Sequence, residues 1–177
     1  MYKVLCIKYK GKNRGFTLVE MLIYMGIFSI MLIALTQIFT SIIDVQLESQ
    51  SNGSVSQDGQ YILSRLTYDI QRAQDIATPS AQALGTPSST LGLVINDVNG
   101  TSYTYASSSG NLVVTNNLGT NQLNGYDTSL SEVSFTRLGN SGAGNKNTIT
   151  FSFTLTSKTA RNSVYQSRTF QSSIGLR

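Results

Sequence analysis

The sequence contains no histidine and only one cysteine, Cys6, among its 177 residues. The lack of histidine excludes histidine-based catalytic triads and most zinc sites. A lone cysteine excludes an internal disulfide framework and a thiolate metal site. An enzyme built on paired carboxylates or on Ser and Lys needs neither residue, but no spacing in the sequence argues for one. We therefore expect no enzyme activity, no catalytic residue, no metal and no cofactor.

Charged residues are also scarce, at 12% of the chain, and they are unevenly placed. Residues 1–15 contain five basic residues and no acidic one: Lys3, Lys8, Lys10, Lys12 and Arg14. The whole chain has a formal net charge of +4, so the residues after Gly15 carry −1. The basic character belongs to the N-terminal segment and does not predict that the remainder binds nucleic acid.

The most prominent feature present is an apolar run from Phe16 to Ile43. It contains 28 residues, one charged residue (Glu20) and no proline. As a helix at ~1.5 Å per residue it would span about 42 Å, which exceeds the roughly 30 Å hydrocarbon core of a bilayer. The basic residues on one side of the run predict residues 1–15 in the cytoplasm and residues 44–177 outside.

Two simpler interpretations of this apolar run, a secretory signal peptide and a plain membrane anchor, do not explain all of its features. A secretory signal peptide has an apolar region of only ~7–15 residues and a small-residue cleavage site, and neither feature is found here. A plain membrane anchor explains the length but not a carboxylate, which costs roughly 2.5–3.5 kcal/mol within a membrane helix. If the chain were cut before Phe16, the new α-amino group could neutralise Glu20, within one subunit or between neighbouring subunits.

The stretch KNRGFTLVEML, residues 12–22, resembles the cleavage and methylation signature of type IV prepilins and type II secretion pseudopilins. It combines a basic leader, Gly15 before the cut, Phe16 after it, Glu20 four residues later and a long apolar helix. The resemblance implies that prepilin peptidase cleaves between Gly15 and Phe16 and that Phe16 is N-methylated. It also implies that Glu20 pairs with a neighbouring subunit's N-terminus during filament assembly. Major pilins often carry a proline near the position of Gln37, and this chain has none.

Residues 44–78 follow a helical pattern, with apolar residues at near-helical spacing: Ile62, Leu66, Ile70 and Ala73. Arg65, Asp69 and Arg72 fall between them as polar positions. Asn52-Gly53 and Gly59 favour a bend or break near residues 51–59. Two Thr-Pro pairs, at Pro79 and Pro87, predict a linker over residues 79–90.

From Leu91 onward the apolar pattern changes to a period of two. Thr148–Thr156 is the clearest strand, with Ile149, Phe151, Phe153 and Leu155 facing one way. The other predicted strands are Leu91–Val98, Thr101–Ala106, Asn111–Thr115, Ser131–Leu138 and Val164–Ile174. Asn99-Gly100 predicts a hairpin turn between the first two. This pattern predicts an antiparallel sheet with one buried face, covered by the helix over residues 60–77.

The helix and the last strand add a looser resemblance. The run from Tyr61 to Ala73 resembles the helix that follows the membrane segment in PilW-type and GspJ-type minor pilins, and residues Phe170 to Arg177 resemble their closing strand. The resemblance implies an α+β, pilin-like fold in which a long N-terminal helix, transmembrane in its first half, packs on a C-terminal antiparallel sheet. Minor pilins of this kind lie at or near the filament tip and help to initiate assembly.

Three further patterns have ordinary structural explanations. Asp97–Gly100 resembles part of a calcium loop but lacks the further carboxylates, so we expect a hairpin turn. Gly139–Lys146 is rich in glycine like a phosphate loop, yet a strand follows it, so we expect a surface loop. Four tyrosines could form an adhesive or DNA-stacking surface, but without a basic cluster we expect sheet packing: Tyr103, Tyr105, Tyr126 and Tyr165.

Together these observations predict five segments: a cleaved leader (1–15), a transmembrane and assembly helix (16–43), an extracytoplasmic amphipathic helix (44–78), a linker (79–90) and an antiparallel β domain (91–177). The expected function is a minor pilin or pseudopilin of the cytoplasmic (inner) membrane and then of a pilus or pseudopilus. The expected partners are prepilin peptidase, other subunits through the N-terminal helix, the inner-membrane assembly platform and, before assembly, the lipid bilayer. The alternatives are a tip adhesin, whose DNA or surface receptor the sequence does not support, and a membrane-anchored enzyme.

Overall fold

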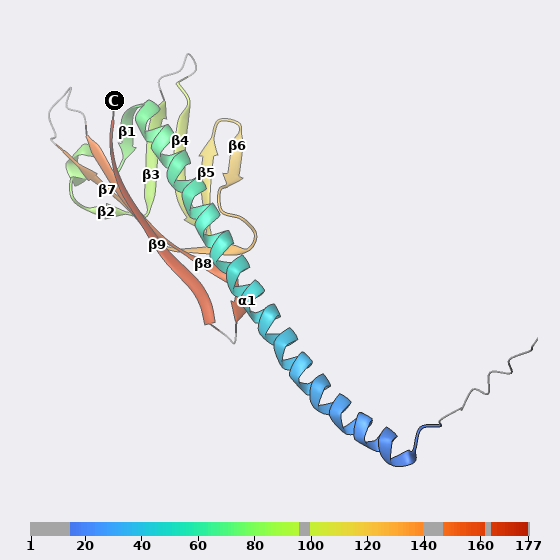
Figure 1. Cartoon of the computed structure of the whole chain (residues 1–177). Helices are drawn as coiled ribbons and strands as arrows, with labels where there is room; N and C mark the ends of the chain where they lie inside the picture. Colours follow the sequence, from blue (N-terminus) through green and yellow to red (C-terminus); the bar gives the residue numbers. More distant parts are fainter. Residues whose placement is uncertain (1–14, 96–99, 140–146, 162–163, 177) are drawn as a thin grey trace, which may run out of the picture. The chain divides into compact units, whose positions relative to one another are not determined.

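The computed structural model describes residues 15–95, 100–139, 147–161 and 164–176 (Figure 1). The chain divides into two compact units, Met1–Ile43 and Asp44–Arg177, and each is described by itself. One helix, α1 (Leu18–Arg72), begins in the first unit and ends in the second. Among the described residues nine strands follow it, all in the second unit. The α+β, pilin-like fold expected from the sequence is therefore confirmed.

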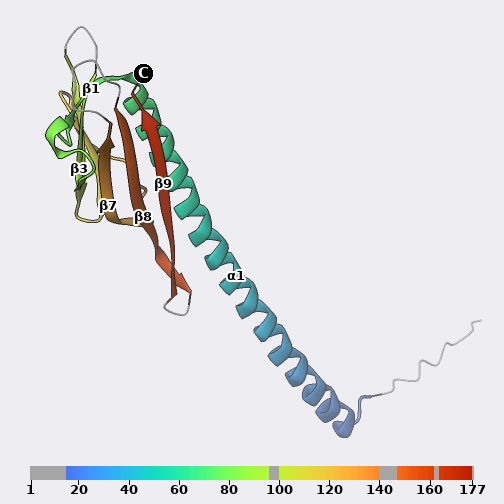
Figure 2. The same ribbon diagram turned by 90° about the vertical axis from the view of Figure 1, so that its left-hand side faces the viewer.

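The part of α1 in the second unit buries one stripe of residues against the strands. Each buried position lies three or four residues from another, as a single helix face requires: Ser51, Val55, Gly59, Ile62, Leu66, Asp69 and Ile70. Figure 2 shows this part of α1 lying along the strands β7, β8 and β9. The bend or break favoured near residues 51–59 does not take the form of a break, because α1 is helical through all of them. Gly59 serves close packing instead, since its Cα faces the ring of Phe170 in β9.

The strands form two antiparallel sheets rather than the single sheet expected. The first has the order β1-β3-β4-β5-β6, and the second has the order β2-β7-β8-β9. The first sheet consists of β1 (Ala73–Thr78), β3 (Thr90–Ile95), β4 (Ser102–Ser108), β5 (Asn111–Asn116) and β6 (Gly119–Gln122). The second consists of β2 (Pro87–Ser88), β7 (Thr128–Leu138), β8 (Thr148–Arg161) and β9 (Val164–Gly175). The division arises because β7 pairs with β8 and β2, and not with β5 or β6.

The helix ends at Arg72, six residues before the expected end at Thr78. Residues Ala73–Thr78 form β1, which pairs with β3 and has two irregularities in its register. Ala73 and Ile76 are both buried there. Their spacing of three fits a helix, but an irregular strand buries the same two positions, so the apolar pattern did not distinguish the two structures. The expected linker also contains a short 3-10 helix, Ala81–Ala83, and the strand β2.

The expected hairpin between β3 and β4 is confirmed by their antiparallel pairing, in which Leu93 lies opposite Tyr103. Residues 96–99 of its turn lie outside the described residues. The alternation in β8 is also confirmed, because Ile149, Phe151, Phe153 and Leu155 are all buried. The final strand begins at Val164 as expected.

Strand β7 changes the face that it buries halfway along. Leu130 is buried at an even position, whereas Phe135 and Arg137 are buried at odd positions. The register with β8 shifts between Ser131 and Ser134, and Glu132 within that shift has a φ of 52°. This is a β-bulge, which inserts one residue and exchanges the two faces of the strand beyond it.

One continuous apolar core joins the helix to both sheets. Four phenylalanine rings from β7, β8 and β9 pack in series within it: Phe135, Phe151, Phe153 and Phe170. Their successive centroids are 6.4, 6.4 and 5.4 Å apart, within the range at which aromatic pairs add to simple burial. Helix α1 is held on the sheets mainly by this core.

Candidate functional site

The candidate site lies at the start of α1. Residues Gly15, Phe16 and Thr17 have irregular backbone and are exposed, and the helix begins at Leu18. The Thr17 Oγ1 accepts a hydrogen bond from the Glu20 N–H at 3.3 Å, as an N-cap residue does. The Gly15–Phe16 peptide bond therefore lies in exposed, non-helical backbone, where proteolytic cleavage is favoured.

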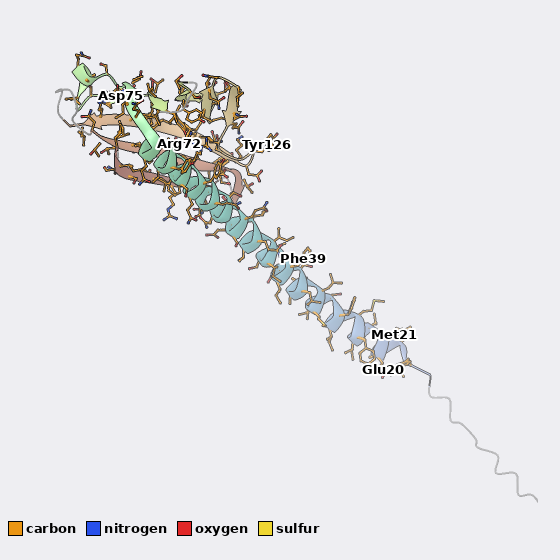
Figure 3. All side chains as sticks on the ribbon, turned by 90° about the horizontal axis from the view of Figure 1, so that it is seen from above. Glu20, Met21, Phe39, Arg72, Asp75 and Tyr126 are labelled. Carbon is orange, nitrogen blue, oxygen red and sulfur yellow. The ribbon has the colours of Figure 1, made fainter. Side chains whose placement is uncertain are left out.

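Glu20 lies in the first turn of α1, where a negative charge interacts favourably with the helix dipole. Thr17 and Glu20 have the spacing of a capping box. The Glu20 carboxylate, however, contacts a different residue: its Oε1 accepts a hydrogen bond from the Tyr24 hydroxyl at 3.1 Å. Figure 3 marks Glu20 on this first turn.

Tyr24 was not predicted as part of the site. Its ring also packs edge-on against the Phe16 ring, with centroids 6.4 Å apart and an interplanar angle of 76°. One side chain thus contacts both Phe16 and Glu20. The sequence signal that could have identified it is the spacing of four residues between Glu20 and Tyr24, which brings the two side chains together on a helix.

The helix beyond this turn is mostly apolar. Its large apolar side chains are exposed as far as Ile43, among them Leu22, Phe28, Leu32, Leu35 and Phe39. Figure 3 labels Phe39 on this part of the helix. This surface is far larger than the apolar patches that soluble monomers expose, so it requires lipid or other apolar helices around it. In the described part of the chain, α1 is the helix that is long and apolar enough to cross a membrane.

A second polar cluster lies inside the globular unit. Asp69, predicted as a polar position between the apolar residues of the helix, is fully buried. Its Oδ2 accepts a hydrogen bond from the Tyr105 hydroxyl of β4 and lies 2.7 Å from the Arg65 Nε. Burial, followed by the contact with Asp69, raises the pKa of Tyr105 well above its ordinary value. This cluster joins α1 to the first sheet.

The four tyrosines do not behave alike. Tyr105 is buried and Tyr103 is half-buried, as expected for sheet packing. For Tyr126 and Tyr165 that expectation is wrong, because they are 89% and 56% exposed. Since Tyr105 is inaccessible and bound to Asp69, the four cannot form one adhesive surface.

Among the residues that the structure describes, no group of three acidic or cysteine side chains could hold a metal ion. The prediction of a turn at Asp97–Gly100 lies mostly outside those residues, and so does the predicted surface loop at Gly139–Lys146. Gly100 itself has a φ of 61°, which suits a tight turn.

The fold and this site define a class of protein: a single apolar N-terminal helix, suited to a single-pass membrane anchor, that continues into an α+β globular unit. The family model of the prokaryotic N-terminal methylation motif matches residues 10–36. The chain therefore carries the leader motif of type IV pilins and pseudopilins. This match confirms the resemblance to prepilins and pseudopilins that was seen in residues 12–22. Comparison with curated proteins gave no match, and comparison with solved structures gave none.

Proposed function

We propose that this chain is a minor pilin or pseudopilin. It is stored in the membrane through residues 16–43, cleaved between Gly15 and Phe16, and N-methylated on Phe16. It then enters, or initiates, a type IV pilus or a secretion pseudopilus.

The observation that carries this proposal is the geometry at the start of α1. Within the matched segment, an exposed non-helical Gly15–Phe16 bond precedes the helix, and Glu20 lies one turn inside it. A helix surface with many large exposed apolar side chains follows. Cleavage would place a positive α-amino group at Phe16, at the start of the apolar segment 16–43. The one carboxylate of this segment is that of Glu20. Pairing between the two groups on neighbouring subunits would neutralise both charges in a setting of low polarity.

The proposed partners follow from the same features. Prepilin peptidase recognises the leader and the bond, and other subunits pack against the apolar surface of α1. The assembly platform of the inner membrane extracts the subunit from the bilayer. The five basic residues before the apolar run support an orientation with the leader in the cytoplasm and the globular unit outside.

The PilW-type or GspJ-type assignment is the finer part of the proposal. It is supported by the last turns of α1, whose buried residues Ile62, Leu66 and Ile70 hold the helix on the sheets. It is also supported by the closing strand, where Phe170 packs against α1 at Gly59.

Mass spectrometry of the protein extracted from membranes and from filaments tests the first step. In filaments we expect an N-terminus at Phe16 that carries one methyl group. An intact Met1 in the filament fraction, or a cut at any other bond in either fraction, would overturn the proposal.

The substitution Glu20→Ala tests the second step. We expect the variant to be cleaved and to remain in the membrane, but to be depleted from filaments. Thr36→Ala is a matched control, because Thr36 is exposed on the same apolar helix and its hydroxyl contacts only the Leu32 carbonyl oxygen. Incorporation of the Glu20→Ala variant at the level of the control would remove Glu20 from its assigned role.

A further inference from the structure

Tyr24 contacts both of the residues on which the proposed processing and assembly depend. We infer that Tyr24 is a positioning residue of this site: it holds the Glu20 carboxylate in place through its hydroxyl and the Phe16 side chain through its ring. The inference rests on the proposed function, because it assigns a role within the same site.

The spacing of the three residues explains the arrangement. Phe16, Glu20 and Tyr24 are each four residues apart, and side chains at this spacing lie one above another along a helix. The Tyr24 hydroxyl is 3.1 Å from the Glu20 Oε1, and the rings of Tyr24 and Phe16 meet edge to face. Phe16 itself precedes the first helical residue, so the ring contact fixes a residue that the helix backbone does not.

The surroundings make the hydrogen bond important. In hydrocarbon neither the hydroxyl nor the carboxylate finds water, so each polar group needs a partner within the protein. Tyr24 and Glu20 satisfy each other before cleavage, when no α-amino group exists at Phe16. The Glu20 carboxylate thus has a neutral partner while the subunit waits in the membrane.

The arrangement also leaves room for the later ion pair. A carboxylate has two oxygens that accept hydrogen bonds, and the Tyr24 hydroxyl uses Oε1. Oε2 can then receive the α-amino group of a cleaved neighbouring subunit while Tyr24 keeps the side chain in one rotamer. A carboxylate that is held in place loses less conformational entropy when the partner arrives.

The competing explanation is that Tyr24 is simply an aromatic residue at the membrane interface, where tyrosine is common. The two explanations differ in what the hydroxyl does. An interfacial tyrosine acts independently of Glu20, whereas a positioning residue changes the environment of the Glu20 carboxylate.

The test uses the full-length protein in its native membrane, with the substitutions Tyr24→Phe and Tyr24→Leu. The ratio of filament-bound to membrane-bound subunit is measured, together with cleavage by mass spectrometry. We expect Tyr24→Phe to be cleaved normally and its incorporation to fall about three- to tenfold, the loss that corresponds to one hydrogen bond between side chains in a membrane. Tyr24→Leu should fall further, because it also loses the contact with Phe16.

Two matched controls isolate these effects. Tyr61→Phe removes a hydroxyl from an exposed tyrosine of the same helix, and Phe28→Leu removes an aromatic ring from the same apolar surface. Tyr61→Phe should be incorporated into filaments better than Tyr24→Phe. Phe28→Leu should be incorporated better than Tyr24→Leu. The second readout is the ¹³C resonance of the Glu20 carboxyl group in lipid bilayers, which we expect to shift in Tyr24→Phe but not in Tyr61→Phe.

The outcomes separate this inference from the proposed function. If Glu20→Ala assembles normally, the proposed role of Glu20 fails, and the inference fails with it. If Glu20→Ala is excluded but Tyr24→Phe assembles like Tyr61→Phe, only the role of Tyr24 is overturned. Reduced incorporation of Tyr24→Phe with an unchanged Glu20 resonance also overturns it, because the effect would then not act through the carboxylate.

Discussion

At the scale of single residues, Gly59 shows how tertiary packing can require a residue that a helix disfavours. A side chain at this position would meet the ring of Phe170 far inside van der Waals contact. Glycine costs about 1 kcal/mol relative to alanine in a helix interior. The absence of a side chain at Gly59 permits the close approach of β9 to α1, and this packing offsets the cost.

We therefore expect Gly59→Ala to destabilise the globular unit, although alanine is the better helix former. Overpacking of this kind costs about 1–3 kcal/mol. The measurement is urea unfolding of the detergent-solubilised protein, monitored by circular dichroism. Gly53→Ala is the matched control, because a Cβ at Gly53 meets no atom within 4 Å. The control should gain up to about 1 kcal/mol, and a gain for both variants would contradict the packing explanation.

Tyr105 gives a prediction on pH. The pKa of an ordinary tyrosine is about 10, and burial together with Asp69 raises that of Tyr105 in the folded protein. The unfolded chain therefore releases this proton at a lower pH than the folded protein does. The stability that Tyr105 contributes is complete below pH about 10 and is lost above it, by up to about 1.4 kcal/mol per pH unit.

The variant Tyr105→Phe lacks both the hydrogen bond and this titration. We expect it to be less stable than the original protein at pH 8, by about 1–3 kcal/mol, and this difference should shrink between pH 10 and pH 11.5. Urea unfolding at several pH values measures it. Tyr126→Phe serves as the control, because Tyr126 is exposed and its removal should leave the pH dependence unchanged. Parallel curves for Tyr105→Phe and the original protein would count against the assignment.

At the scale of elements, the sequence predicted those features that depend on neighbours along the chain. The apolar run predicted the first half of α1, and the alternation over Thr148–Thr156 predicted β8 and its buried face. The motif at Gly15, Phe16 and Glu20 was identified in the same way, because its residues lie within one short segment. Local patterns of this kind are read directly from the order of residues.

The features that escaped prediction depend on residues far apart in the sequence. Asp69 was predicted only as a polar position of the helix, because its buried hydrogen bond involves Tyr105, 36 residues away. The second sheet depends on the pairing of β7 with β8, which are separate segments of the chain. A bulge at Glu132 exchanges the two faces of β7. Tyr24 was missed for another reason: within an apolar helix it resembled the other large side chains.

Strand β7 also supplies a prediction at this scale. Arg137 is buried, and its Nη1 donates to the carbonyl oxygens of Ile76 and Pro79 at 2.7 and 3.2 Å. It thus joins β7 to the segment that leaves β1. We expect Arg137→Met to lower the free energy of unfolding by about 2–4 kcal/mol, because two buried carbonyl groups lose their donor.

The matched control for Arg137→Met is Asp75→Asn. Asp75 is exposed, and its Oδ1 lies 3.7 Å from the Arg137 Nη2. A long ion pair whose carboxylate is exposed to water contributes less than about 1 kcal/mol, so Asp75→Asn should be nearly neutral. Urea unfolding compares the two variants. If Asp75→Asn cost as much as Arg137→Met, the ion pair rather than the buried carbonyl contacts would hold this junction.

At the scale of the whole molecule, the distribution of charge distinguishes the chain before and after processing. The full sequence has an isoelectric point of about 9.3. The five basic residues lie before the Gly15–Phe16 peptide bond, and the residues after this bond have a net charge of −1. A single cleavage at that bond therefore changes the sign of the net charge of the protein.

We expect the protein in filaments to focus below pH 7, and the unprocessed protein in membranes to focus near pH 9.3. N-methylation of Phe16 leaves the amino group basic, so it does not obscure the shift. Isoelectric focusing of membrane and filament fractions, followed by immunodetection of the globular unit, measures both forms. A strain without prepilin peptidase provides the control and should contain the basic form alone. A cut inside the leader, for example after Lys8, would leave Lys10, Lys12 and Arg14 attached and give a net charge of +2. A basic filament form would therefore contradict cleavage at Gly15–Phe16, even where the mass of the subunit had decreased.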